Sequence, residues 1–272
     1  MLNVSLGPLT MQVSHLQLAL SLLIAAGVGH LVGRRQRVGI VDTLTAMLLV
    51  ALLAARLVFV LMWFEQYRQA PWTILDIRDG GFERWTGVAV ALLFVLWRGW
   101  RAPVLRRPLA LGLLAGVLAW STSGAPGMLR MTTRAPLPDV ALTTLAGTPT
   151  TLAALAGGKP MVVNLWASWC PPCRREMPVL SAAQQREPGI TFVFVNQGEN
   201  AGIAASYLAA ESFVLTNIVL DRGTLLGKAI GSTALPTTLF YDAGGRLVDT
   251  HLGALSAASL ASKLQRLQDN DL

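Results

Sequence analysis

The chain has 272 residues, of which 53% are hydrophobic and only 14% are charged, and its mean hydropathy is +0.51. A chain this apolar is not an ordinary soluble globular protein, so part of it must lie in lipid. The formal net charge of +7 is typical of proteins that bind nucleic acid or an anionic membrane surface. Residues 1–124 carry a net +6 and residues 125–272 only +1, so the charge belongs to the apolar half and we expect no nucleic-acid partner.

Four apolar stretches in the first half predict an all-α transmembrane bundle of about four helices over residues 1–122. The expected spans are residues 15–33, 38–64, 85–100 and 106–122. A membrane-spanning helix needs roughly 20 residues, so the last two spans are short. No Lys or Arg precedes the first stretch, which favours a retained helix over a cleavable signal peptide.

The arginines between these stretches orient the expected spans. They are Arg34, Arg35 and Arg37 after the first span, and Arg98, Arg101, Arg106 and Arg107 after the third. The loop between the second and third spans contains more acids than arginines, and Lys and Arg accumulate in short cytoplasmic loops. We therefore expect a multi-pass protein of the bacterial inner membrane, with its N-terminus and everything after residue 122 in the periplasm.

One arginine, Arg56, lies deep within the second apolar stretch. A charged side chain there is costly enough to suggest a function. The alternative is an arginine in the interior of the bundle, paired with Asp42 or with an acid of the following loop. The sequence leaves open whether Arg56 has a functional or a purely structural role.

The residues around Arg56 resemble a known membrane family. Residues 55–60, followed by residues 72–87 with their Asp-Gly-Gly-Phe sequence, are similar to the front part of prolipoprotein diacylglyceryl transferase, over about residues 35–120. In that family three residues separate the Gly-Gly pair from a functional His, whereas this chain has Trp85 at that position. We therefore expect no acyltransferase activity, and interpret the first half as an anchor or partner-docking unit in contact with membrane lipid.

A stretch rich in Ser, Gly and Pro predicts a linker at residues 123–136, followed by a second domain at 137–272. Its hydrophobic patterns predict strands at 161–167, 190–196 and 217–220, helices at 173–185 and 201–210, a hairpin of strands 237–241 and 246–251, and a final helix at 257–267. This alternation is typical of an α/β sandwich.

Cys170 and Cys173 are the only cysteines, and they lie between a predicted strand and a predicted helix. A zinc site needs about four ligands, and three histidines scattered over both halves do not supply them, so we expect no metal and no cofactor. A purely structural disulfide would close too small a loop to stabilise the chain much. A redox-active disulfide at a helix N-terminus is favoured, because the helix dipole lowers the pKa of a thiol there.

Residues 162–178, including Trp169-Cys170-Pro171-Pro172-Cys173, resemble the thioredoxin fold, specifically the TlpA/ResA/DsbE-like membrane-anchored thiol-disulfide oxidoreductases. The similarity extends over about residues 137–268 and predicts a thioredoxin-like α/β sandwich. It implies that Cys170 attacks and Cys173 resolves the mixed disulfide. It also implies a cis peptide bond at Pro236, with Leu235, Pro236 and Trp169 shaping the substrate-binding groove.

The same resemblance assigns a proton-exchanging carboxyl to Glu176, three residues after Cys173 and on the same helix face. Typical thioredoxins instead have a buried Asp in the preceding strand, where this chain has Asn164. A solvated surface glutamate is the alternative for Glu176.

Pro171 and Pro172 have no N–H to donate to a Cys170 thiolate, which predicts a moderately reducing pair. We expect a reductase of disulfide-bearing periplasmic proteins. The resemblance implies apocytochrome c or a copper-centre assembly protein as substrate, and a DsbD-like membrane electron donor. The alternatives are net thiol oxidation or isomerisation, a lipid-modifying membrane enzyme with an appended redox domain, and a non-catalytic binding module.

Overall fold

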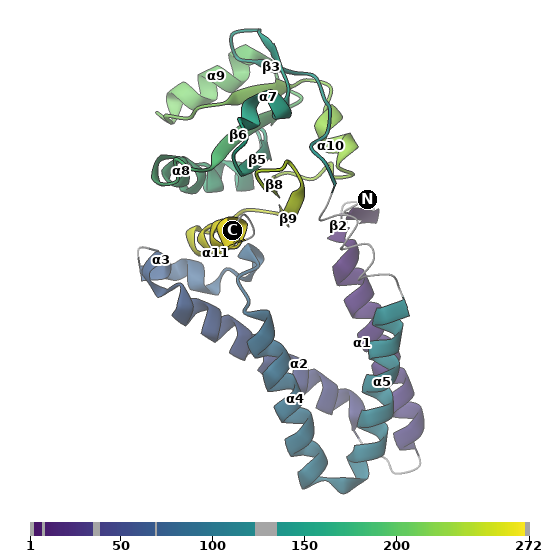
Figure 1. Ribbon diagram of the computed structural model, residues 1–272. Helices are drawn as coiled ribbons and strands as arrows, with labels where there is room; N and C mark the ends of the chain where they lie inside the picture. Colours follow the sequence, from purple (N-terminus) through teal and green to yellow (C-terminus); the bar gives the residue numbers. More distant parts are fainter. Residues whose placement is uncertain (1–2, 7–8, 35–38, 69, 123–134, 270–272) are drawn as a thin grey trace. The chain divides into compact units, whose positions relative to one another are not determined.

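The computed structural model describes residues 3–6, 9–34, 39–68, 70–122 and 135–269. Contacts divide the chain into two compact units (Figure 1). The helical unit comprises Met11–Ile74 and Gly81–Leu129, and the α/β unit comprises Arg130–Leu272 with the short segments Met1–Thr10 and Leu75–Gly80. Most of the expected linker, residues 123–134, lies outside the described residues, as do Arg35 and Arg37.

Four long helices build the helical unit: α1 (Val13–Gly33), α2 (Ile40–Met62), α4 (Arg84–Arg101) and α5 (Arg106–Thr122). A short helix α3 (Phe64–Arg68) and the 3-10 turns η2 (Pro71–Leu75), η3 (Ile77–Asp79) and η4 (Pro103–Leu105) connect them. Glu83 caps α4, because its carboxylate accepts from the N–H groups of Trp85 and Thr86. These helices confirm the all-α architecture expected for the membrane region from residue 13 onward, whereas residues 3–6 and 9–12 form two short strands that were not expected.

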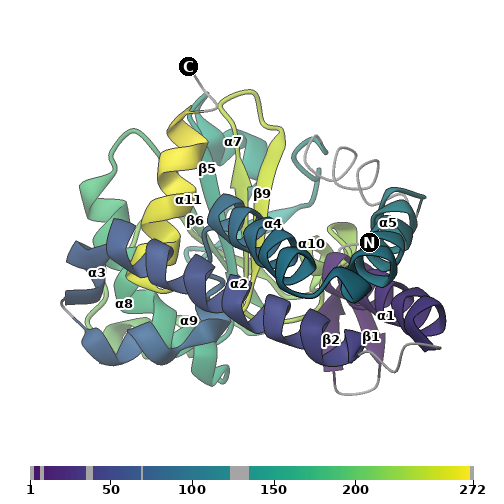
Figure 2. The same ribbon diagram turned by 90° about the horizontal axis from the view of Figure 1, so that it is seen from below.

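Helix α1 packs along α5, and α2 packs along α4, as both views show (Figures 1 and 2). The α1–α5 contact is close because small residues line it. A Cβ atom on Gly112 would lie 2.6 Å from the carbonyl oxygen of Ala25, and one on Gly116 would lie 3.0 Å from that of Ser21. Such small residues let two helix backbones approach each other, which is typical of helix pairs in membranes.

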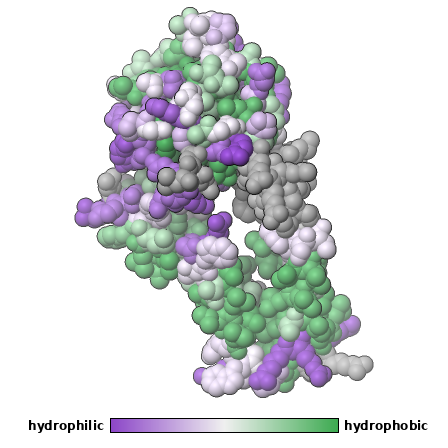
Figure 3. All heavy atoms as spheres, viewed as in Figure 1, coloured by the Kyte–Doolittle hydropathy of each residue, from purple (hydrophilic) through white to green (hydrophobic). Residues whose placement is uncertain are grey.

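Three helices are long and apolar enough to cross a membrane: Leu16–Gly33, Ile40–Met62 and Pro103–Thr122. Figure 3 shows hydrophobic side chains covering much of the visible face of the helical unit. The expected third span forms helix α4, but α4 does not qualify by composition, because Arg84, Arg98 and Arg101 lie within its 18 residues. Of the four expected spans, 15–33, 38–64 and 106–122 therefore correspond to helices that could cross a membrane, whereas the third, 85–100, forms a helix that contains too many arginines.

A seven-stranded sheet forms the centre of the α/β unit, in the order β4-β3-β7-β6-β5-β8-β9. The strands are β3 (Leu142–Thr144), β4 (Pro149–Thr150), β5 (Met161–Trp166), β6 (Thr191–Gln197), β7 (Ile218–Asp221), β8 (Thr237–Tyr241) and β9 (Leu247–Leu252). Strands β5, β6 and β7 run parallel, whereas β8 pairs antiparallel to β5, and β9 to β8. The carboxyl ends of the three parallel strands therefore meet at one edge.

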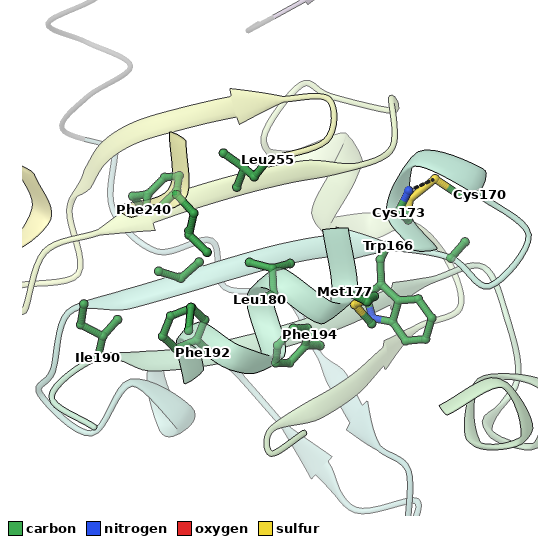
Figure 4. Close-up of a cluster of buried hydrophobic side chains, with 14 of the residues drawn as sticks. Trp166, Cys170, Cys173, Met177, Leu180, Ile190, Phe192, Phe194, Phe240 and Leu255 are labelled. Carbon is green, nitrogen blue, oxygen red and sulfur yellow. Dashed lines mark hydrogen bonds between the residues drawn. A yellow bond between two sulfur atoms is a disulfide. The ribbon is translucent and has the colours of Figure 1, made fainter. Parts of the chain in front are cut away.

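Helices cover both faces of this sheet. Helices α8 (Pro171–Arg186), α9 (Ala201–Ala210) and α11 (Ala257–Asp269) share one hydrophobic cluster with the sheet, and α7 (Leu152–Ala156) and α10 (Leu225–Ala229) share the other. The first cluster contains the buried side chains of Trp166, Phe192, Phe194 and Leu180 (Figure 4). Burying each such side chain stabilises the fold by about 1.5–3 kcal/mol. This arrangement confirms the thioredoxin-like α/β sandwich.

Several short elements were not expected from the sequence. They are β3, β4, α7 and α10 in the α/β unit, and a separate two-stranded sheet of β1 (Asn3–Leu6) and β2 (Leu9–Gln12). Each has five residues or fewer, so hydrophobic periodicity has too few positions to reveal it. The longer predicted elements of this unit all form, with ends within two residues of the expected ones.

Candidate active site

The two cysteines lie at the start of helix α8, directly after the loop that leaves strand β5. Cys170 is the N-cap residue of α8, and a disulfide joins it to Cys173, with the two Cα atoms 5.3 Å apart. The Sγ atom of Cys170 accepts a hydrogen bond from the backbone N–H of Cys173 at 3.3 Å (Figure 4). Pro171 and Pro172 have no N–H, so the first turn offers Cys170 a single amide donor at this distance.

Both cysteines are buried in this disulfide form, Cys170 with an exposed fraction of 3% and Cys173 with 0%. In Figure 4 they lie at one end of the hydrophobic cluster, beyond Trp166 and Met177. The adjacent Trp169 is 68% exposed. The indole of Trp169 is therefore the large apolar group that this segment offers to an approaching molecule.

The peptide bond between Leu235 and Pro236 is cis. Strand β8 follows immediately and pairs antiparallel to β5, with Thr237 opposite Leu165. This register places Pro236 beside the carboxyl end of β5, where the cysteine motif begins. Leu235 packs partly buried against both hydrophobic clusters. The fold thus brings together two segments that are more than sixty residues apart in the sequence.

Glu176 is buried inside the α/β unit, with an exposed fraction of 1%, which overturns the alternative of a solvated surface glutamate. Its Oε1 accepts from the Nδ2 of Asn164 at 2.7 Å, and its Oε2 accepts from the backbone N–H of Leu255 at 3.0 Å. Burial raises the pKa of Glu176 to about 7, and the two hydrogen bonds oppose that rise. A carboxyl with this pKa is protonated and ionised in comparable amounts at neutral pH.

A second buried glutamate, Glu199, holds the loop that precedes Cys170. Its carboxylate accepts from the backbone N–H of Ser168 at 2.8 Å, from the Ser168 Oγ at 2.5 Å, and from the Asn196 Nδ2 at 2.6 Å. The sequence analysis missed this residue. Glu199 lies two residues after the end of strand β6, the parallel neighbour of β5. The carboxyl ends of neighbouring parallel strands lie close together, and this was the signal that could have indicated Glu199.

The residues predicted from the sequence therefore converge at one edge of the sheet. Trp169, Cys170, Cys173 and Glu176 belong to the segment that follows β5, and the strand pairing brings Leu235 and Pro236 beside it. Within the described part of the chain, no group of three or more His, Cys, Asp or Glu side chains could hold a metal ion. The chemistry available at this edge is that of a dithiol or disulfide next to a buried carboxyl.

In the helical unit, Arg56 is buried and hydrogen-bonded to main-chain carbonyl groups. Its guanidinium donates to the carbonyl oxygens of Thr73, Ile74 and Gly81, at 2.8 to 3.3 Å. It also lies over the rings of Tyr67 and Phe82. Since a guanidinium has five N–H donors and stays charged, it can hold the connection between α2 and α4 permanently.

Trp85, the residue at the place of the transferase family's histidine, is 70% exposed on helix α4. Gly81 lies close to Arg56, since a Cβ atom on it would lie 2.5 Å from the Arg56 Nη1. Gly81 is thus explained locally by the close approach of the arginine, and Gly80 by its positive φ of 68°. An indole has no group that could act as a base, so this position lacks the imidazole chemistry of that family.

Comparison with known proteins identifies both halves. Residues 132–264 match the family described as Redoxin, and residues 2–124 match the family described as Prolipoprotein diacylglyceryl transferase. The thiol:disulfide interchange protein DsbE of Pseudomonas fluorescens biotype C is 33% identical, over 49% of this chain and 76% of that protein. The thiol-disulfide oxidoreductase ResA of Geobacillus thermodenitrificans is 31% identical, over 48% of this chain and 75% of that protein.

Among solved structures, a chain described as a thiol:disulfide interchange protein DsbE from Chlorobium tepidum is 27% identical, with a TM-score of 0.45, covering 50% of this chain and 96% of that one. The Redoxin match covers the half of the chain that contains the cysteine pair. Disulfide-bearing proteins are the substrates that such relatives imply, and the transferase-like half implies a membrane context. The chain belongs to the DsbE/ResA-like family of thiol-disulfide oxidoreductases within the redoxins, and carries a transferase-like membrane region in front.

Proposed function

We propose that the chain is a membrane-anchored reductase of protein disulfides that works through Cys170 and Cys173. The observation that carries this proposal is the position of the Cys170 Sγ at the N-cap of α8 with the Cys173 N–H as its amide donor. The helix dipole favours a thiolate on Cys170, which makes it the nucleophile. Because the two prolines contribute no donor, this thiolate is stabilised less than in motifs with free amides, which favours the oxidised pair and hence a reducing protein.

The proposed reaction has two exchange steps. The Cys170 thiolate attacks one sulfur of the substrate disulfide, forming a mixed disulfide and releasing the first substrate thiolate. The Cys173 thiolate then attacks the Cys170 sulfur, which releases the second substrate thiolate and leaves the pair oxidised. Two electrons pass from this protein to its substrate. Glu176 accepts the proton of the Cys173 thiol before the second step, a role supported by its burial and its pKa near 7.

Trp169, Leu235 and Pro236 form the proposed substrate-binding edge. The exposed indole of Trp169 offers apolar contact area, and the backbone of Leu235 offers hydrogen-bonding groups to an extended peptide. The cis bond and the pairing of Thr237 with Leu165 support this assignment, because they bring Pro236 beside the cysteine motif. Exchange of Trp169 for Ala should therefore raise the KM for a folded substrate more than it lowers kcat.

The redox direction is tested by equilibrating the full chain with glutathione buffers and measuring the fraction of Cys170–Cys173 disulfide. We expect a potential clearly below the value of about −120 mV that strong periplasmic oxidants have. A value near −120 mV would instead assign net oxidation or isomerisation to the pair.

For the location, we propose a multi-pass protein of the bacterial inner membrane with residues 137–272 in the periplasm, residues 1–122 as the membrane region and 123–136 as the linker. The basic loops after the first and third predicted spans support this orientation. A membrane-impermeant maleimide applied to intact spheroplasts should label reduced Cys170. Labelling only after lysis would reverse the orientation.

A reductase in an oxidising compartment needs electrons from elsewhere, and we propose a DsbD-like membrane protein as the donor. By the same family resemblance, we propose apocytochrome c or a copper-centre assembly protein as the substrate. Both assignments are tested by capturing the proteins that form a mixed disulfide with Cys170.

The decisive experiment is a Cys173→Ala variant of the full chain produced in cells. Without Cys173 the mixed disulfide on Cys170 is not resolved, so we expect defined, reductant-sensitive adducts with periplasmic proteins. The matched control is the variant that also has Cys170→Ala, which should show none. If the single variant forms no adducts while the domain is folded, the protein is a non-catalytic binding module.

For the membrane region, we propose an anchoring or docking role without acyl transfer. The observation in support is Trp85, which is exposed and has no basic group at the family's histidine position. An assay of diacylglyceryl transfer with the purified full chain should give no product above background. A Trp85→His variant tests whether this one position accounts for the absence.

A further inference from the structure

A buried carboxamide next to Glu176 has one end that makes no hydrogen bond. Asn164 lies in the middle of β5 with an exposed fraction of 1%, and its Nδ2 donates to Glu176 Oε1 at 2.7 Å and to Thr238 Oγ1 at 3.0 Å. Among the described residues, the Asn164 Oδ1 has no hydrogen-bond partner although it is buried. A buried unpaired polar atom typically costs about 1–3 kcal/mol, so the position calls for an explanation.

The two hydrogen bonds described for Glu176 are both ones that it accepts. Its Oε1 accepts from the Asn164 Nδ2 and its Oε2 accepts from the Leu255 N–H. A protonated carboxyl has an O–H group to donate, and neither of these N–H groups can accept it. Protonation of Glu176 therefore calls for an acceptor that neither partner offers in its present orientation.

Glu176 nevertheless holds a proton for part of the time at neutral pH, since burial raises its pKa to about 7. The polar groups that contact it are Asn164 from β5 and the Leu255 N–H from the segment before α11. Thr238 from β8 is hydrogen-bonded to Asn164. Cys173 lies three residues before Glu176 on α8 and is part of the disulfide here, so it bears a thiol only after reduction. The neutral amide and hydroxyl must therefore serve both charge states of the carboxyl.

We propose that Asn164 turns its carboxamide by half a rotation about the Cβ–Cγ bond whenever Glu176 takes up a proton. In the turned form, Oδ1 accepts from the Glu176 O–H and from the Thr238 hydroxyl, and Nδ2 occupies the former place of Oδ1. The two ends of the amide have nearly the same size, so the rotation needs no repacking. This inference rests on the proposed role of Glu176 as the proton partner of Cys173.

The proton balance is simple. One proton leaves the Cys173 thiol and binds the Glu176 carboxylate, and no electron moves in this step. The Thr238 hydroxyl changes from acceptor to donor, which a hydroxyl can do by turning. Each orientation of Asn164 leaves one unpaired amide end and keeps both contacts to Glu176 and Thr238. Glu176 thus keeps a hydrogen bond to Asn164 in both of its charge states. Asn164 acts as a positioning residue, because it orients the Glu176 carboxyl and does not itself exchange the proton.

The residue type matters for this role. Aspartate at position 164 would place a second carboxyl beside Glu176, and the two would compete for one proton. Leucine would support neither charge state. Only a carboxamide offers a donor at one end and an acceptor at the other in the same volume.

The test uses nuclear magnetic resonance on the full chain in lipid nanodiscs, with ¹³C-labelled glutamate side chains and ¹⁵N-labelled asparagine side chains. Between pH 5 and 9, we expect the Glu176 Cδ signal and the Asn164 amide signals to change with one common midpoint near pH 7. In the Glu176→Gln variant, the Asn164 signals should become independent of pH. The proposal is overturned if the Asn164 signals stay constant while Glu176 titrates, or if Glu176 does not titrate in this range.

A kinetic arm separates this inference from the proposed function. The rate at which Cys173 of the reduced chain resolves a mixed disulfide is measured against pH in Asn164→Leu and in Thr238→Val. In Asn164→Leu we expect the midpoint of the pH dependence to shift to higher pH, because the Glu176 carboxylate loses a hydrogen-bond donor. In Thr238→Val we expect a smaller shift, with a midpoint nearer that of the unsubstituted chain. If Glu176→Gln leaves the pH dependence of the rate unchanged, Glu176 is not the proton acceptor of Cys173. The proposed rotation of Asn164 is still supported in that case if the Asn164 signals of the unsubstituted chain follow the titration of Glu176.

Discussion

Arg56 in the helical unit and Glu176 in the α/β unit are both buried ionisable side chains, with exposed fractions of 9% and 1%. The guanidinium of Arg56 donates only to oxygens in its described hydrogen bonds, and a guanidinium is a permanently charged donor group. Glu176 changes its charge near neutral pH, and its partner Asn164 is left with an unpaired atom. A permanent charge needs only one fixed set of hydrogen-bond partners and can serve a structural role, whereas a group that titrates needs partners that suit both of its charge states.

The largest effect should come from the nucleophile. Cys170→Ser should lower the turnover of a fluorescent peptide disulfide by about three orders of magnitude or more, because a hydroxyl cannot replace the thiolate. Arg56→Ala should leave the turnover per folded molecule unchanged. If Arg56→Ala abolishes turnover in folded protein, the arginine takes part in the chemistry and the contrast between the two units is wrong.

Loss of the arginine should instead lower stability. Arg56→Ala leaves the carbonyl groups of Thr73, Ile74 and Gly81 without this donor, and should reduce the free energy of unfolding by about 3 kcal/mol. Thermal unfolding in detergent measures this, together with protease cleavage between residues 70 and 82, which should increase. The matched control is Arg101→Ala, since Arg101 is exposed at the end of α4.

Glu176 should make the stability of the α/β unit depend on pH. Because its pKa is raised from 4.5 to about 7, the folded chain binds more protons than the unfolded chain between these values, so stability falls as the pH rises through that window. The change should amount to at most about 3 kcal/mol. Hydrogen exchange of strand β5 in the full chain measures it, with Glu176→Gln as the reference without this slope. A parallel pH dependence in both proteins would show that Glu176 is not the titrating group.

The smallest expected effect is a difference in stability between alanine variants of two glycines in the helical unit. Gly112→Ala places a Cβ 2.6 Å from the carbonyl oxygen of Ala25 and should cost about 1–2 kcal/mol, because α1 and α5 must move apart. Gly27→Ala meets nothing within 4 Å and should be neutral or slightly stabilising. Equal melting temperatures of the two variants in detergent would mean that α1 and α5 do not pack closely in lipid.

The sequence predicted the core of the α/β unit well because its signals are local. The apolar run of β5, the apolar run of β6 and the turn at Asp242 are each formed by a few consecutive residues. The cysteine motif was equally readable, since its chemistry depends on two residues and a helix start. The burial of Glu176 was harder, because its carboxyl is enclosed by Asn164 and Leu255, which no local pattern connects to it.

Long-range partners account for what the sequence did not show. Glu199 was missed because its contact with Ser168 arises only when β5 and β6 lie side by side. The carbonyl groups around Arg56 were not foreseen either, since every residue has a carbonyl group and the sequence cannot say which ones face inward. The bounds of α4 were not foreseen exactly either, since the helix extends one residue beyond the expected span 85–100 at each end and so includes Arg84 and Arg101 as well as Arg98.

The close contact between α1 and α5 has a consequence for biosynthesis. Its two sides are contributed by the first and the last long helices of the helical unit, around Ala25 and Gly112. A chain that emerges from the ribosome in order cannot complete this contact until nearly all of the helical unit has been made. Helix α1 is therefore made before its partner exists, with its small-residue face uncovered, and the contact can form only as synthesis of the oxidoreductase domain begins.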